Sequence, residues 1–170
     1  MSQSNAELLT EQHHLIKAGI HGLVDGSGSR EELRESVLLL RKHIYGEETA
    51  LFPVLDRDQR YWMALAQMRW EHGDMWPHIE ACIDLLDKNA WLDDFIPAAS
   101  TLLNLLHIHD PKEEEGLYAA AHLYQSGKDG PALAELFATP DLPSGWRCLR
   151  APGPDGKPGD ALVGEPRAEG

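Results

Sequence analysis

Five ionisable side chains occupy positions where an amphipathic helix would normally place leucine or isoleucine: His13, Glu47, His72, His109 and Glu113. Ionisable groups are costly inside a protein core unless they are paired or bind a metal ion. The five residues are spread over four apolar segments of the chain, so that every segment contributes at least one. We therefore expect them to meet in one shared site.

Two of the four segments carry the same pattern, HxxxEE followed two residues later by leucine and an aromatic residue. Residues 43–52 read HIYGEETALF, and residues 109–118 read HDPKEEEGLY. Side chains four residues apart lie on one face of a helix, so the histidine and the first glutamate of each copy can face the same ion. The pattern predicts two His–Glu pairs: His43 with Glu47, and His109 with Glu113.

The other two segments share a shorter pattern, because Gln12 precedes His13 as Glu71 precedes His72. Within the first segment we expect His13 to be the ligand, with His14, which lies off the apolar stripe, as the alternative. The remaining histidines are expected at the surface or on helix flanks: His21, His78, His107 and His122.

Several polar neighbours of the candidate ligands have two interpretations. Three glutamates adjoin these ligands: Glu48, Glu71 and Glu114. We expect them to be solvated, with the alternative that they accept a hydrogen bond from an imidazole. Three tyrosines are expected to serve packing, with a redox or hydrogen-bonding role as the alternative: Tyr45, Tyr118 and Tyr124.

Apolar residues recur at steps of three and four along four stretches, which predicts four amphipathic helices. The stripes run over Leu9–Leu23, Leu33–Val54, Leu65–Leu86 and Leu102–Ala120. A glycine- and serine-rich turn follows the first stripe, and Ser29 with Glu32 forms a capping-box signature for the second helix. The fourth helix is expected to end near Ser126-Gly127, and a short helix is expected over 131–138.

Four long helices with short connections and no credible strand predict an all-α fold, an up-down-up-down four-helix bundle. We assign the bundle to residues 1–139. Residues 140–170 are rich in proline and glycine and lack apolar periodicity, so we expect a loosely ordered C-terminal tail. Trp146 and Leu149 are the residues that could pin part of this tail to the bundle.

The loop positions test whether the histidines share one level of the bundle. Two residues at the same height in antiparallel neighbours must be equally far from the loop that joins their helices. The midpoint of His13 and His43 falls in the Gly-Ser-Gly-Ser turn, at residue 28. The next two midpoints, for His43 with His72 and for His72 with His109, also fall in the expected turns. The four histidines are therefore predicted to lie at one level.

Four imidazoles and two carboxylates at one level are suited to two metal ions, each bound by two histidines, with Glu47 and Glu113 bridging. A nitrogen and oxygen donor set without thiolates suits iron, manganese or zinc. Iron fits best, because each ion would keep room for a solvent bridge and for an external ligand.

The order His, HxxxE, His, HxxxE resembles the hemerythrin-like, or HHE cation-binding, family over roughly residues 5–125. The resemblance implies a left-handed four-helix bundle with a non-haem, oxo- or hydroxo-bridged di-iron centre. It also implies six metal ligands: His13, His43, Glu47, His72, His109 and Glu113. Oxygen-carrying hemerythrins have a second histidine one turn after the third-helix ligand, where this chain has Trp76. The pattern is therefore closer to members linked to nitric oxide, peroxide or iron handling.

Charge and composition exclude some classes of binding partner. The formal net charge of −13 argues against nucleic acid and anionic membranes, which bind basic patches. The sequence contains no apolar run that could span a bilayer and no recognisable signal peptide, and its two cysteines form no disulfide framework, so we expect a cytoplasmic protein. We also expect a monomer or a homodimer.

We expect a protein that reacts with or binds O2, NO or peroxide in oxidative or nitrosative stress or in iron handling. One alternative is a non-enzymatic oxygen- or iron-binding or sensing protein. A second alternative is a structural bundle with a zinc ion or with no metal.

Overall fold

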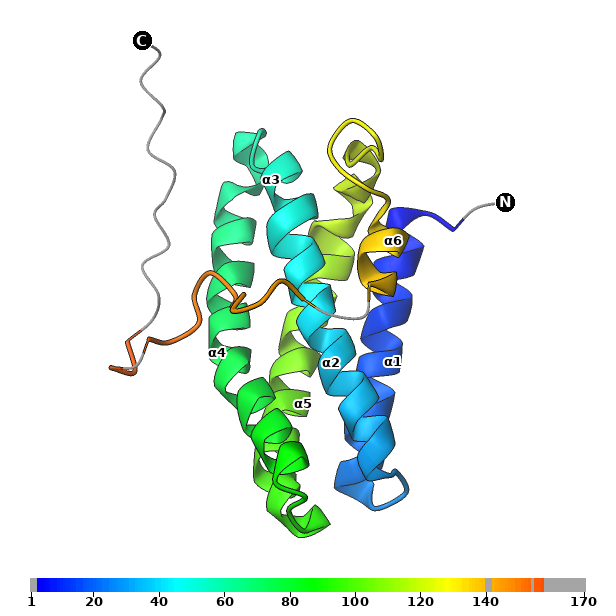
Figure 1. Cartoon of the computed structure of the whole chain (residues 1–170). Helices are drawn as coiled ribbons and strands as arrows, with labels where there is room; N and C mark the ends of the chain where they lie inside the picture. The colour runs from blue at the N-terminus through cyan, green and yellow to red at the C-terminus, as the bar shows by residue number, and fades with distance from the viewer. Residues whose placement is uncertain (1–2, 140–141, 154, 158–170) are drawn as a thin grey trace.

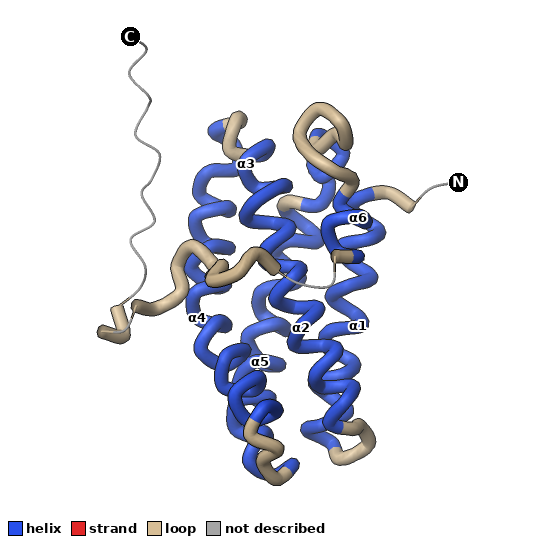
Figure 2. Tube along the Cα trace, in the orientation of Figure 1, coloured by secondary structure: helices blue, strands red, loops and turns tan. Residues whose placement is uncertain are grey.

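The computed structural model describes residues 3–139, 142–153 and 155–157, and its four long helices form an antiparallel bundle (Figure 1). The long helices are α1 (Asn5–Asp25), α2 (Arg30–Gly46), α4 (Trp62–Asp87) and α5 (Leu92–Gly116). Helices α1 and α4 each pack against both α2 and α5. The prediction of an up-down-up-down bundle is therefore confirmed, and the regular elements of the described residues are all helical (Figure 2).

The helices begin and end where local chemistry dictates. Ser4 accepts a hydrogen bond from the backbone N–H of Glu7, whose carboxylate accepts one from the N–H of Ser4 in return. Ser29 and Glu32 form the same capping box at the start of α2, as the sequence predicts. Gly26 ends α1 with φ 78°, a left-handed conformation that favours glycine. None of the described helices is long and apolar enough to cross a membrane.

The end of α2 contains an irregularity that periodicity does not predict. The chain continues from α2 into a π-helical turn, η1 (Glu47–Leu51), and then into α3 (Phe52–Leu55). The N–H of Phe52 donates to the carbonyl of Glu47, five residues earlier. Such π turns often occur at functional sites, and this one begins at a candidate ligand.

The fourth long helix is shorter than predicted. Instead of reaching Ser126-Gly127, α5 ends at Gly116, and the 3-10 turn η3 (Tyr118–Leu123) follows. Glycine is a poor helix former, and Leu117, whose N–H still donates to the Glu113 carbonyl, is the last residue before the 3-10 turn. The predicted short helix is present as α6 (Leu133–Ala138), and η2 (Gln59–Tyr61) lies in the turn before α4.

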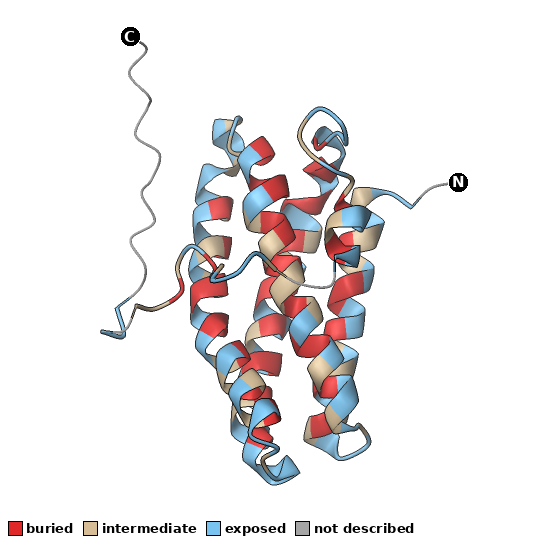
Figure 3. Ribbon diagram, in the orientation of Figure 1, coloured by how far each residue is buried: buried red, intermediate tan, exposed pale blue. Residues whose placement is uncertain are grey.

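Two apolar clusters fill the bundle, and the inward faces of the helices are buried along its length (Figure 3). Along α1, Leu9 belongs to one cluster and Ile16 to the other, with His13 between them. Along α4, Met68 and Met75 flank His72 in the same way. A polar layer therefore separates two halves of the core.

Residues 142–153, here called the C-terminal strap, lie across α2 and α4 (Figure 1). Trp146 makes edge contacts with Trp76 and Tyr45, at ring-centroid distances of 5.4 and 5.0 Å. The Arg147 guanidinium donates to both carboxylate oxygens of Glu80 at 3.1 and 3.0 Å. Trp146 thus pins the tail as predicted, whereas the Leu149 side chain remains 48% exposed.

Of the rest of the predicted tail, the structure describes only the short stretch 155–157. Residues 140–141, 154 and 158–170 lie outside the described residues. The division of the chain after residue 139 stays a prediction.

Close packing of the strap on Gly73 makes a prediction for stability. A Cβ atom at Gly73 would lie 2.6 Å from the Arg150 carbonyl oxygen, so Gly73→Ala forces the strap or α4 to move. We expect a loss of about 1–3 kcal/mol in the free energy of unfolding, the usual cost of overpacking. Urea denaturation followed by circular dichroism measures this.

Gly116→Ala is the matched control, because its Cβ would meet no atom within 4 Å. It should leave stability unchanged or raise it by at most about 1 kcal/mol, as expected from helix propensity. Equal destabilisation by both substitutions would contradict the packing of the strap on α4.

Candidate metal centre

The polar layer brings together all six side chains that the sequence nominates, one or two from each segment of the bundle. Helix α1 supplies one histidine, α2 with η1 supplies a His–Glu pair, α4 supplies one histidine, and α5 supplies the second His–Glu pair. Their exposed fractions are at most 3%. The six residues are His13, His43, Glu47, His72, His109 and Glu113.

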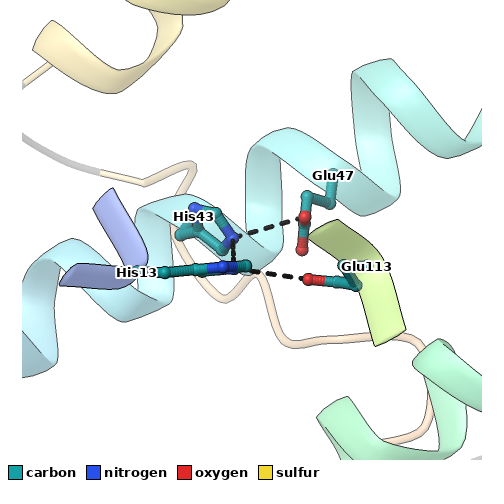
Figure 4. A group of neighbouring side chains, drawn as sticks. All are labelled: His13, His43, Glu47 and Glu113. Atoms are coloured by element: carbon teal, nitrogen blue, oxygen red, sulfur yellow. Dashed lines mark hydrogen bonds and ion pairs between the residues drawn. The ribbon is translucent and has the colours of Figure 1, made fainter. Parts of the chain in front are cut away.

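One half of the layer, here called the first position, is formed by His13, His43, Glu47 and Glu113 (Figure 4). The two imidazoles meet through their Nε2 atoms, 3.0 Å apart. His43 Nε2 lies 3.3 Å from Glu47 Oε1, and His13 Nε2 lies 3.4 Å from Glu113 Oε2. One donor atom from each of the four residues lies within 4.8 Å of the others.

The other half, the second position, is formed by His72 and His109 together with the same two glutamates. His72 Nε2 lies 3.3 Å from Glu47 Oε2 and 3.8 Å from Glu113 Oε1. His109 Nε2 lies 3.2 Å from Glu113 Oε2. Glu47 thus directs one oxygen to each position, and Glu113 contacts histidines of both.

The second position contains buried polar atoms that suit a cation. Glu47 Oε2, His72 Nε2 and Glu113 Oε1 are buried and have no hydrogen-bond partner among the described residues. Buried polar atoms are normally satisfied, and all three belong to residues of one cluster. Neither free cysteine, Cys82 or Cys148, is a member of a cluster, so the donors are nitrogen and oxygen only. The buried His/Glu clusters therefore fit a site for two metal ions.

Each imidazole makes a hydrogen bond through its Nδ1 atom, on the side away from the centre. The four side chains that accept these hydrogen bonds form a ring around the bundle. Glu114 of α5 accepts from His13 at 2.9 Å, and Gln12 of α1 accepts from His43 at 2.8 Å. The ring is completed by Glu48 with His72 and by Glu71 with His109, both at 2.9 Å.

This ring corrects the expectation that Glu48, Glu71 and Glu114 are solvated. Each glutamate instead accepts a hydrogen bond from a histidine of a neighbouring helix, which was the alternative interpretation. An acceptor at Nδ1 fixes the ring orientation and leaves Nε2 free to face the centre. The sequence does contain a sign of this ring. Gln12 and Glu71 each precede a candidate histidine ligand, and Glu48 and Glu114 each follow a candidate glutamate ligand.

Tyr118 is also a member of the centre, where it makes hydrogen bonds, the alternative to the expected packing role. Its hydroxyl donates to Glu47 Oε1 at 2.6 Å and lies 2.9 Å from His13 Nε2. Its ring stacks on His13 with centroids 5.3 Å apart. In the other copy of the repeat the equivalent residue is Phe52, which stacks on His72 at 5.7 Å. The aromatic position of the repeat thus covers one histidine in each half.

The structure also separates the six residues from other polar candidates. His14 is exposed, in agreement with the choice of His13. Asp110 is a buried carboxylate that the sequence analysis missed, and it pairs with Lys17 at 2.7 Å. The other histidines are exposed or half-buried and outside the clusters: His21, His78, His107 and His122.

The pKa values in the centre follow from the burial of two carboxylates, Glu47 and Glu113, among four imidazoles. Burial opposes charge on His72 and His109, but hydrogen bonds and charges from the glutamates outweigh it and raise their pKa values to about 9 and about 10. Burial and Glu47 act to raise the pKa of Glu113, yet His109 and His13 lower it to about 2. Metal uptake near neutral pH must therefore displace protons from imidazoles.

Two segments that follow η3 cover the centre from outside. The Phe137 ring of α6 stacks on His43 at 6.1 Å and lies where a Cβ on Gly46 would be. The strap packs on Gly73 of α4, and its Leu149 N–H donates to Glu48 Oε2 at 2.7 Å. The first position is thus covered by α6, and the outer partner of His72 is held by the strap.

The ring of outer partners predicts a loss of metal affinity without loss of a ligand. Glu114→Ala removes the acceptor of the His13 Nδ1–H group, so His13 is less well oriented. We expect metal affinity to fall about 10- to 100-fold. Competition titration with a chromophoric chelator and Zn2+ measures the change.

The adjacent Glu115→Ala serves as the control, because Glu115 is exposed and outside the ring. This substitution should leave the metal affinity within about twofold of wild type, since solvent and salt screen the charge of an exposed carboxylate. Equal losses for the two variants would show that general charge, not the bond to His13, sets the affinity.

Comparison with known proteins agrees with this geometry. The hemerythrin HHE cation binding domain matches residues 4–121. A search of curated proteins and a search of solved structures found no match. The matched segment covers more than half of the chain and includes all six clustered residues. The chain therefore belongs to the hemerythrin HHE cation-binding family.

Proposed function

We propose that this protein is a non-haem di-iron protein whose centre reacts with a small oxidant such as peroxide, NO or O2. The proposed ligands are His13 and His43 at the first position, and His72 and His109 at the second, with Glu47 and Glu113 bridging. The supporting observation is the pair of buried clusters that share both glutamates. Manganese or zinc would also suit the nitrogen and oxygen donors.

Two iron ions in this layer would supply one-electron redox chemistry and coordination positions for an external ligand. The protein contributes the rest. Its six side chains are almost completely buried, so water is kept from the donors. The ring of Nδ1 acceptors holds each imidazole in place, and Tyr118 provides a hydroxyl group directly beside Glu47 Oε1.

Trp76 supports reaction over reversible oxygen storage. It lies one helical turn after His72, where oxygen carriers of this family have another histidine, and it is fully buried. Its indole N–H donates to Glu80 at 2.8 Å, and its ring contacts Trp146 of the strap. Trp76 therefore supplies no donor at this place, which would leave the second position with fewer protein donors than in an oxygen carrier.

The proposal includes a role in oxidative or nitrosative stress or in iron handling. It keeps the expectations of a cytoplasmic monomer or homodimer that binds neither nucleic acid nor membrane, in line with the net charge of −13. A protein that holds O2 or iron without turnover, as carrier, store or sensor, is the alternative that the assay below separates.

The ligand assignment predicts which histidines matter. His72→Ala and Glu113→Ala should lower iron content from about two ions per chain and reduce thermal stability, because ligand binding energy is partly folding energy. His78→Ala and His122→Ala should leave iron content unchanged, since both residues lie outside the clusters. Elemental analysis of the purified variants tests this. Equal iron loss in both groups would refute the assignment.

The reaction is tested on iron-loaded wild-type protein. Peroxide consumption and the lifetime of any adduct with O2 or NO are measured by stopped-flow spectroscopy at matched iron content. We expect multiple turnovers with peroxide or NO and no long-lived O2 adduct, because Trp76 removes one donor from the second position. A protein that holds O2 reversibly and ignores peroxide and NO would instead be a carrier.

A further inference from the structure

The Tyr118 hydroxyl occupies an unusual place, because it lies among donor atoms of all four residues of the first position. Its oxygen is 2.6 Å from Glu47 Oε1 and 2.9 Å from His13 Nε2. It is also 3.1 Å from Glu113 Oε2 and 3.2 Å from His43 Nε2. Tyr118 is only 2% exposed. Any cation bound by these four donors must therefore lie close to the phenol oxygen.

The second position has no such oxygen. The residue that matches Tyr118 in the repeat is Phe52, whose ring lies parallel to His72, with an interplanar angle of 6°. The two halves of the centre are otherwise alike, with two histidines each and the same two glutamates. The main difference between the residues that line the two positions is therefore Tyr118 at the first and Phe52 at the second.

We propose that Tyr118 is a fifth protein donor at the first position and that the external ligand therefore binds at the second position. This proposal rests on the proposed di-metal function. If a metal ion were bound among these donors, Tyr118 would hold it as a phenolate, and the phenolic proton would pass to solvent, as with other acidic ligands of bound cations. The added negative charge would favour ferric over ferrous iron at that position.

This assignment gives the two metals different roles. The first position, with five protein donors and the Phe137 ring over His43, has less room for an external ligand. The second position, with four donors and the apolar Phe52 ring stacked on His72, would keep more open coordination. Peroxide, NO or O2 would thus meet the metal held by His72 and His109.

Resonance Raman spectroscopy of the iron-loaded, oxidised full-length protein tests the proposal. Excitation in a visible charge-transfer band enhances phenolate ring vibrations only if a tyrosine oxygen binds ferric iron. We expect wild type to show the band and these vibrations. Tyr118→Phe should lose both while it retains at least half of the iron, because the other donors remain.

Tyr124→Phe is the control, because Tyr124 is also buried but donates to the carbonyl of Pro131, away from the centre. It should keep the band at wild-type intensity. If Tyr118→Phe does not fold, single Phe variants of the other tyrosines give the answer by elimination, since each should retain the band: Tyr45, Tyr61 and Tyr124.

Iron-loaded wild type without phenolate vibrations, or a Tyr118→Phe variant that keeps them, would overturn the proposal while leaving the di-iron function intact. A wild-type chain that binds no iron would instead contradict the proposed function, and this proposal with it. Iron content and Raman spectrum therefore distinguish the two failures.

Discussion

The burial of two carboxylates, Glu47 and Glu113, is the constraint that organises the bundle. Both are fully buried, and an unpaired charge in such a place costs several kcal/mol. Four imidazoles at one level offset that cost, and every long helix must supply one of them. The lengths of the three connections follow, because each must return the next helix with its histidine at the same height.

The ring of Nδ1 acceptors makes the position of each long helix depend on its neighbours. Each long helix presents an imidazole to the centre and an acceptor to the imidazole of a neighbour, so α5 holds α1, α1 holds α2, α2 with its π turn holds α4, and α4 holds α5. Displacement of any helix would therefore disturb two histidines. A network of this kind specifies one packing arrangement more strictly than apolar contacts alone.

Sequence reasoning predicted the bundle and the convergence of the six residues because both depend on spacing, which a linear pattern records. It placed Glu48, Glu71 and Glu114 in solvent because a glutamate on a helix flank is usually exposed, and only the angle between helices turns these toward a neighbour. Tyr118 was expected to serve packing, with hydrogen bonding only as the alternative, for a related reason. Its hydroxyl reaches the centre because α5 ends at Gly116 and the chain turns into η3, and the apolar pattern gave no sign of that break.

The covers over the centre lie in a different part of the chain from the groups that they cover. The family match ends at residue 121, whereas Phe137 and the strap come later. Mutations in this C-terminal segment can change how molecules reach the two metal positions while every clustered side chain stays the same. Selection can thus tune access and reactivity separately, and two chains with identical His and Glu patterns need not share a substrate.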